Sequence, residues 1–320
     1  MSVGVSVVIC AYTQLRWSQL EAAVESVLMQ EPRPVELVVV VDHCPELEHR
    51  VKERFGGAVK VMSNSFRQGL SGARNTGSAA CTGDVVAFLD DDAYAERGWL
   101  AAHARPYEDQ DVVGVGGLVV PAWDGREPPW FPPEFRWVVG CSYVGLPEGT
   151  AQIRNPIGAN MSFRRHAVEA AGGFSEGLGR VGSVPLGCEE TELSIRITAR
   201  SPGSRIMHEP HAVVHHHVAP SRTRFRYFSR RCWAEGLSKA HVARLVGVER
   251  SLGSERSYVT TTLAAGVRGN LGRAVSTRDI WQLARAGAMV IGLLVTTAGF
   301  GAGRAGSVTT FHHNRGKNQQ

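Results

Sequence analysis

The sequence predicts an α/β fold: a Rossmann-like mixed sheet flanked by helices and followed by a basic, helical C-terminal region. Residues 5–12 and 35–41 are β-rich apolar runs separated by helical spacing at residues 20–30. Strand, helix and strand within about 40 residues form a βαβ unit with a right-handed crossover. Residues 85–89 are a further apolar run between a Gly-containing turn and three carboxylates, as in a strand buried on both faces.

The remaining elements alternate between helical and strand patterns. The pattern predicts a helix around residues 46–55, a strand at 59–62, a helix ending at Gly83, a helix around Trp99, a strand at 112–120, a helix at 166–171 and a helix opening at Cys188. The Pro- and Trp-rich stretch 121–133 is more typical of an irregular binding loop.

The acidic run Asp90-Asp91-Asp92 ends the third apolar strand. Open α/β sheets bind ligands at the carboxyl ends of their strands, and three adjacent negative charges there are costly unless a cation shares them. Alternation along an extended chain places Asp90 and Asp92 on one side and Asp91 on the other. The pattern favours an Mg²⁺ or Mn²⁺ site over a solvated acidic turn.

A glycine-rich stretch at residues 67–77 contains Gly69, Arg74 and two further glycines. The glycines let the backbone approach a ligand closely, and an arginine at a helix start can pair with phosphate. The alternative is a flexible loop that simply enters the next helix.

Length and composition are those of an ordinary globular protein, with 320 residues, of which 43% are hydrophobic and 20% charged. This allows one elaborated domain or two small ones. No basic segment precedes the first strand, so we expect no signal peptide and a cytoplasmic location. The 6 cysteines include no Cys-x-x-Cys pair, which favours free thiols over disulfides or zinc.

The charge is divided unevenly along the chain. Residues 222–320 contain 16 Lys and Arg against 4 Asp and Glu, whereas residues 1–221 contain 19 against 26. Such a basic region could bind nucleic acid or an anionic membrane surface. It has no zinc-finger or single-strand-binding signature, so we expect a membrane surface and no nucleic acid.

Two segments of the basic region favour membrane contact. Residues 222–250 alternate basic and aromatic side chains, as in an amphipathic interfacial helix. Residues 286–303 are an uncharged run of 18 residues, near the lower limit for a spanning helix. The preferred interpretation is a helix lying in or docking on the membrane; a buried helix and a true span are the alternatives.

Six blocks of sequence, in order, resemble family 2 glycosyltransferases of the GT-A fold. They are Val-Ser-Val-Val-Ile-Cys-Ala-Tyr, Val-Val-Val-Val-Asp, Gly-Leu-Ser-Gly-Ala-Arg-Asn-Thr-Gly, Phe-Leu-Asp-Asp-Asp, Gly-Ala-Asn-Met-Ser-Phe and Glu-Glu-Thr-Glu-Leu. The resemblance covers about residues 4–235. It implies a sugar-nucleotide-binding half at residues 1–120, an acceptor-binding half of the same domain at 121–218, and a membrane-associated tail at 219–320.

The resemblance also implies roles for individual residues. Asp90 and Asp92 would bind a divalent metal, Mn²⁺ or Mg²⁺, with His216 as a further ligand, although His215 and His217 are not distinguished from it by sequence. Glu190 would be the general base, where the family has Asp, and Glu189 is the second candidate. The expected nucleotide-sugar contacts are Ala11, Tyr12, Asp42, Gly69, Arg74, Asp90 and Asp91.

These roles predict an inverting transfer from a UDP- or dTDP-sugar to a glycan or lipid-linked acceptor at the inner face of the plasma membrane. Such a transfer needs a carboxylate base and positive charge on the departing diphosphate. Trp130 and Trp137 could stack on the acceptor or lie in the core. The alternatives are the same fold acting on a soluble acceptor, with the tail as a homo-oligomerisation element, and a non-catalytic nucleotide- or polyanion-binding protein.

Overall fold

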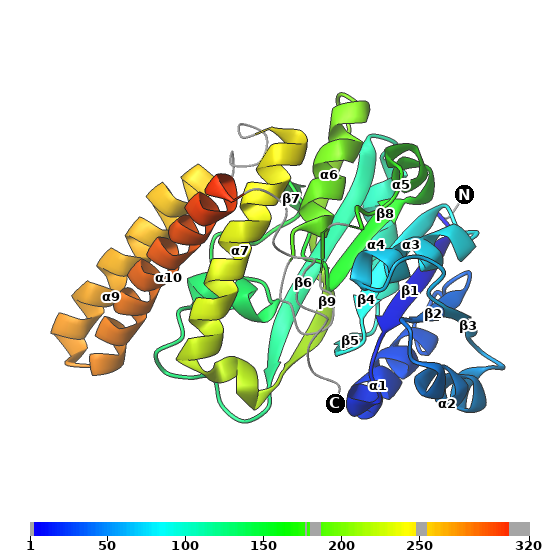
Figure 1. Cartoon of the computed structure of the whole chain (residues 1–320), viewed down its shortest axis with the longest axis horizontal. Coiled ribbons are helices and arrows are strands. Elements are labelled where there is room, and N and C mark those ends of the chain that lie inside the picture. Colours follow the sequence, from blue (N-terminus) through cyan, green and yellow to red (C-terminus); the bar gives the residue numbers. More distant parts are fainter. Residues whose placement is uncertain (1–2, 177, 180–186, 248–254, 307–320) are drawn as a thin grey trace.

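The computed structural model describes residues 3–176, 178–179, 187–247 and 255–306. A sheet of 9 strands runs through the centre in the order β3-β2-β1-β4-β8-β6-β9-β5, with β7 paired to β9. Helices cover its faces, and α7, α9 and α10 lie together at the end far from the N-terminus (Figure 1). This confirms the predicted α/β fold with a C-terminal helical region.

The elements have the following bounds. The strands are β1 Val5–Ala11, β2 Leu37–Val41, β3 Lys60–Ser63, β4 Val85–Asp90, β5 Ala93–Ala95, β6 Val112–Trp123, β7 Ala151–Ile153, β8 Asn160–Arg164 and β9 Arg205–Val218. The α-helices are α1 Trp17–Leu28, α2 Pro45–Phe55, α3 Leu70–Ala80, α4 Trp99–Ala104, α5 Arg165–Ala171, α6 Glu189–Arg200, α7 Phe225–Val246, α9 Ala264–Thr277 and α10 Ile280–Ala305. Short 3₁₀ helices are η1 Gln14–Arg16, η2 Arg105–Glu108, η3 Pro133–Val139 and η4 Pro220–Thr223, and η5 Tyr258–Leu263 is π-helical.

Four neighbouring strands, β3, β2, β1 and β4, are parallel, and β8 is antiparallel to both β4 and β6. The residues of β2 and all but the last of β4 are buried, as their unbroken apolar sequence requires. In register, Ala11 pairs with Val41 and Cys10 with Asp90. The carboxyl ends of these strands therefore meet at one edge, with Asp42 directly after β2.

A buried polar cluster fixes the part of the sheet around β8. Asn160, at the start of β8, donates to the carbonyls of Leu118 and Ala212 and accepts a hydrogen bond from the Trp99 indole. The ring of His103 hydrogen-bonds to Asn160 at 2.8 Å. These bonds join α4, β6, β8 and the residues of β9 at which its register with β6 shifts, because each buried polar group needs a partner.

The predicted strand at 112–120 is confirmed as β6. It continues to Trp123, into the stretch 121–133 predicted as an irregular loop, because Pro121 lies in register with His216 of β9 and does not end the pairing. Helix α7 packs on the sheet domain through Phe228, which is fully buried against Phe131 and Phe135, whereas Phe225 and Trp233 of the same helix are exposed. An interfacial role for this helix stays a prediction.

Helices α9 and α10 form a hairpin that packs on α7 through α10 (Figure 1). At this contact the backbones approach closely, because a Cβ atom on Gly236 would collide with the carbonyl oxygen of Thr296, and one on Gly299 with that of Trp233. Helix α10 is long and apolar enough to cross a membrane, and only 28% of its most apolar window is buried. The alternative of a buried core helix therefore does not fit.

Candidate active site

The acidic turn after β4 lies beside the end of β9. Asp90, Asp92 and His216 each offer a ligand atom, and these atoms lie within 4.8 Å of one another. The backbone N–H of His217 donates to the carbonyl oxygen of Asp92 at 2.8 Å, which ties the two segments together. Two carboxylates and an imidazole are a donor set that suits a divalent ion such as Mn²⁺, so the residues fit the metal predicted from sequence.

The other two histidines of the triplet face elsewhere. His215 contacts the Glu96 carboxylate at 2.6 Å and stacks on Tyr94, and the His217 ring lies 3.9 Å from the Asp124 carboxylate. Strand alternation explains the difference, since neighbouring residues of β9 point to opposite sides of the sheet. Of the three, His216 is the residue in the site.

Several cations surround Asp92, which is 5% exposed. Its Oδ2 atom lies 3.1 Å from Nη1 of Arg16 and 3.2 Å from Nη2 of Arg222, and its Oδ1 atom lies 3.1 Å from Nε2 of His216. Although burial opposes ionisation, His216 and Arg222 hold the pKa of Asp92 well below its usual range. Burial also disfavours the charged imidazole, but Asp92 raises the pKa of His216 to about 10.

Asp91 is outside the group of Asp90, Asp92 and His216, but it shares the Nη1 atom of Arg16 with Asp92. Its Oδ1 atom accepts a hydrogen bond from Arg16 at 2.9 Å, and its buried Oδ2 atom has no partner among the described residues. Burial, together with the charge of Asp92, raises the pKa of Asp91 to about 7. Asp91 lines a cavity shared with Asp90, Asp92 and His216, where a polar group of a ligand could donate to the Oδ2 atom.

Arg74, on α3, connects the two acidic parts of the site. It is 2% exposed and donates to Glu189 at 2.8 Å, to Asp90 at 3.2 Å and to the carbonyl oxygen of Gly158 at 2.9 Å. A buried guanidinium held on three sides is rigid. Arg74 therefore holds Asp90 and Glu189 in place by ion pairs. Of the two adjacent glutamates, Glu190 is the one that Arg74 does not contact by a hydrogen bond.

Asp42 and the glycine-rich loop are joined by hydrogen bonds. The carboxylate of Asp42 accepts from the Asn64 amide at 2.7 Å and from the backbone N–H of Gly69 at 2.9 Å. Gly69 has φ 137°, a conformation that favours glycine. Asp42, Ala11 and Tyr12 line a cavity that also contains the acidic turn. Gly69 does not line this cavity, and its contribution is the hydrogen bond that orients Asp42.

Glu190 lies at the start of α6 and lines the cavity. Its carboxylate accepts a hydrogen bond from the Thr191 hydroxyl at 3.2 Å. Burial, with the charge of Glu189, raises the pKa of Glu190 to about 8. A carboxylate with a raised pKa inside a cavity has the properties of a general acid or base.

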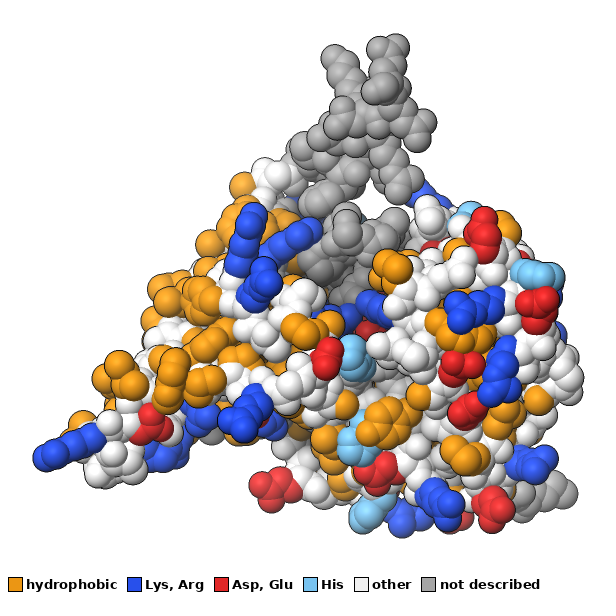
Figure 2. All heavy atoms as spheres, turned by 90° about the horizontal axis from the view of Figure 1, so that it is seen from below, with side chains coloured by type: hydrophobic (Ala, Val, Ile, Leu, Met, Phe, Trp, Pro, Cys, Tyr) orange, Lys and Arg blue, Asp and Glu red, His pale blue; other side chains and the backbone are white. Residues whose placement is uncertain are grey.

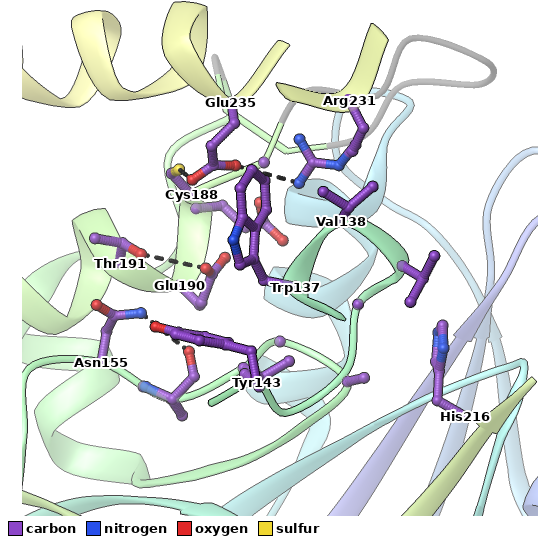
Figure 3. A pocket seen from close by; sticks show the side chains of 18 of the residues that line it. Trp137, Val138, Tyr143, Asn155, Cys188, Glu190, Thr191, His216, Arg231 and Glu235 are labelled. Carbon is purple, nitrogen blue, oxygen red and sulfur yellow. Dashed lines mark hydrogen bonds and ion pairs between the residues drawn. The ribbon is translucent and has the colours of Figure 1, made fainter. Parts of the chain in front are cut away.

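One cavity of about 790 Å³ joins these groups to the C-terminal helices. It extends from Asp42 and the acidic turn, past Glu190, to residues of α7, η5 and α10. Figure 3 shows Trp137 standing beside Glu190, with Arg231 and Glu235 of α7 above it. Trp137 thus lines the cavity, whereas Trp130 packs against Phe131, Phe225 and Phe228 in an aromatic cluster.

Comparisons with known proteins identify the family. Residues 6–172 match the family described as Glycosyl transferase family 2. A glucosyl-dolichyl phosphate glucuronosyltransferase of Haloferax volcanii is 40% identical over 238 residues, covering 73% of this chain and 76% of the relative. This chain belongs to glycosyltransferase family 2.

Solved structures support the GT-A fold of this glycosyltransferase. The mannosyltransferase PcManGT from Pyrobaculum calidifontis, in complex with GDP-Man and Mn²⁺, has a TM-score of 0.58 at 17% identity, covering 92% of this chain and 87% of its own. GalNAc-T7 with UDP, GalNAc and Mn²⁺ has a TM-score of 0.52 at 17% identity, covering 82% of this chain and 57% of its own. At such low identity the likeness concerns the fold.

Sequence reasoning missed three residues that shape the site of the glycosyltransferase. Arg16 and Arg222 neutralise the acidic turn, and Asn64 orients Asp42. Arg222 follows the histidine triplet closely in sequence, and this short spacing is the local feature that could have identified it. Arg16 ends the short helix η1 and Asn64 follows β3, and neither segment has a sequence pattern that marks the residue, because it is the parallel strand ends that bring both to the site.

Proposed function

We propose that this glycosyltransferase moves a sugar from a nucleotide diphosphate, UDP or dTDP, to a hydroxyl group of a sugar carried on a lipid phosphate, with inversion at C1. The observation that carries the proposal is the continuous cavity, in which the acidic turn and Glu190 share one space with the C-terminal helices. The name of the Haloferax volcanii relative, which specifies glucosyl-dolichyl phosphate, supports the acceptor class.

In this proposal residues 1–120 bind the donor. Asp42, with Ala11 and Tyr12 beside it, contacts the nucleotide, and one of its four acceptor positions remains after its bonds to Asn64, Gly69 and His43. Asp90, Asp92 and His216 hold the divalent ion, which supplies positive charge for the donor diphosphate. Arg16 and Arg222 add positive charge at the same place.

Residues 121–218 provide the base. The acceptor hydroxyl oxygen attacks C1 of the donor sugar while its proton passes to the Glu190 carboxylate, and the C1–O bond breaks with its electrons moving to the diphosphate. A base with its pKa raised to about 8 accepts this proton effectively near neutral pH. Glu189 takes the role of positioning residue, because its Oε1 atom accepts from Arg74 at 2.8 Å.

In this proposal the enzyme is attached to the cytoplasmic side of a membrane, and the C-terminal hairpin supports the attachment itself. Figure 2 shows it projecting from the molecule with hydrophobic side chains along it. Large apolar side chains are exposed on both helices, namely Leu271, Val275, Ile280, Trp281, Leu283, Val290, Ile291 and Leu294. Arg268, Arg273 and Arg278 are exposed beside them, the combination that anionic lipid surfaces attract.

The test is a transfer assay with Mn²⁺, a panel of UDP- and dTDP-sugars that includes UDP-glucuronate, and citronellyl phosphoglucose as a short lipid-phosphate acceptor. We expect one donor to give a product whose new linkage has the opposite anomeric configuration, read by NMR. A retained configuration would contradict single displacement. Metal-dependent nucleotide binding without transfer from any donor would favour a non-catalytic binding protein, and better transfer to free oligosaccharides would favour a soluble acceptor.

A further inference from the structure

The face of α7 that lines the cavity carries three ionisable side chains at successive helical turns. Arg231 pairs with Glu235 at 3.3 Å, and Lys239 pairs with the same carboxylate at 3.4 Å. Lys239 also contacts Glu255 at 2.6 Å, and Glu255 accepts from Arg154 at 2.8 Å. All five line the cavity, and the function proposed above assigns none of them a role.

On α7 itself, two cations, Arg231 and Lys239, share the single carboxylate of Glu235, and the three side chains are 13–22% exposed. In addition, the Nη1 atom of Arg231 has less than 1 Å² of exposed surface and no hydrogen-bond partner among the described residues. Burying a charged donor without a partner is costly, so this N–H group is available to an acceptor atom of a ligand that enters the cavity.

The group lies between the catalytic carboxylate and the apolar end of the cavity. On one side, the Cys188 thiol, two residues before Glu190, donates to Glu235 at 3.4 Å. On the other side, Gly236 packs directly on the α10 backbone at Thr296 and Phe300. Beyond it the cavity is lined by apolar residues of η5 and α10: Tyr258, Val259, Leu263, Leu293 and Phe300.

We propose that Arg231, supported by Lys239, binds the phosphate that joins the acceptor sugar to its lipid. This inference rests on the proposed function and names the group that recognises its acceptor. The order along the cavity matches such a molecule: a sugar hydroxyl at Glu190, an anion at α7 and a hydrocarbon chain against η5 and α10. A guanidinium suits the anion because it offers phosphate two parallel N–H donors.

The experiment measures binding by calorimetry with the full chain in detergent, in the presence of UDP and Mn²⁺. The probes are citronellyl phosphoglucose, citronellyl glucoside, which lacks the phosphate, and glucose 1-phosphate, which lacks the lipid. The variants are Arg231→Gln, Arg231→Lys and the matched control Arg226→Gln, an exposed arginine of the same helix. Metal-dependent UDP binding and the unfolding midpoint of each variant show that its fold is kept.

We expect the wild type to bind citronellyl phosphoglucose about 10-fold or more tightly than citronellyl glucoside, as one charge-assisted pair would give. Arg231→Gln should remove this preference, Arg231→Lys should keep part of it and Arg226→Gln all of it. A preference that survives in Arg231→Gln, or an equal loss of affinity for both citronellyl probes, would overturn the proposal. Glucose 1-phosphate binding as tightly as citronellyl phosphoglucose would overturn the lipid-linked assignment in favour of a soluble sugar phosphate.

The binding result separates this inference from the proposed function. A wild type that prefers the phosphate-bearing probe but transfers no sugar would contradict the proposed function and leave the phosphate site in place. Transfer to both citronellyl acceptors with the same kcat/KM would contradict the phosphate site and leave the glycosyltransferase function in place.

Discussion

The two ends of the cavity contain charge clusters that are built differently. At the donor end the adjacent carboxylates of Asp90, Asp91 and Asp92 share the cations of Arg16, Arg74 and Arg222. At the α7 end, by contrast, two cations, Arg231 and Lys239, share the single carboxylate of Glu235.

The comparison suggests two different ways to bind phosphate. An acidic cluster binds a diphosphate only through an added metal ion, so its affinity depends on that ion. A cluster with excess arginine and lysine binds phosphate directly, and its affinity does not depend on metal. If this is correct, the two ends should respond differently to the same treatments.

The largest effect is expected from Asp92→Ala at the donor end. The change removes a ligand from the group of Asp90, Asp92 and His216, so calorimetric titration with UDP and Mn²⁺ should show no metal-dependent binding. Asp92→Asn, which keeps the side-chain size, should do the same, whereas Asp124→Ala, an exposed carboxylate nearby, should bind normally. Citronellyl phosphoglucose binding should be retained in all three, and unchanged UDP binding in Asp92→Asn would contradict the metal assignment.

Glu190→Gln should lower kcat at least about 100-fold, because it removes the base that accepts the acceptor proton. Both ends of the cavity should still bind their ligands, since Glu190 is outside the ion pair of Glu189 and Arg74. Single-turnover rates and calorimetry measure the two quantities separately. Glu189→Gln is the contrasting variant: it should weaken donor binding through Arg74, and a larger fall in kcat there would assign the base to Glu189.

The pH dependence should reflect the same carboxylate. Glu190 must be ionised to act as a base, and its pKa is raised to about 8. We therefore expect kcat/KM to rise about tenfold per pH unit below pH 8 and to level off above it. A profile that is flat between pH 6 and 8 would contradict this role for Glu190.

A smaller effect is expected on the outer face of the hairpin. Leu294 is 63% exposed on α10. If it enters the membrane surface, Leu294→Ser should remove about 1 kcal/mol of transfer free energy and lower binding to anionic vesicles roughly 5-fold. Sedimentation with vesicles measures this, and Leu15→Ser, at an exposed site far from the hairpin, is the control. Equal vesicle binding by both variants would place the membrane contact elsewhere.

Much of the fold could be predicted because it depends on local patterns. The apolar runs gave β1, β2 and β4, and the position of Asp90 at the end of a buried strand gave the acidic edge. The packing of α7 could not be predicted in this way. Its alternation of arginines and aromatics does not show which aromatic ring is buried, because the burial of Phe228 depends on Phe131 and Phe135, which are distant in sequence.

The candidate site likewise has parts that could be predicted from the sequence and parts that could not. The histidine triplet was recognisable, but which of its rings faces Asp92 depends on which side of the sheet each residue of β9 points to. The unpaired Nη1 atom of Arg231 was invisible in the sequence, because its significance lies in a cavity built by α7, η5 and α10 together. Long-range partners of this kind leave no periodic signal along the chain.

The glycine contacts between α7 and α10 have a practical consequence for protein engineering. Because Gly236 and Gly299 hold the two helices together through backbone contacts, the exposed leucines and isoleucines of α10 contribute little to that packing. Replacing them with lysine and glutamate should give a detergent-free, crystallisable variant that keeps the cavity wall intact. Such a resurfaced protein would allow the soluble donor chemistry to be studied apart from any lipid phase.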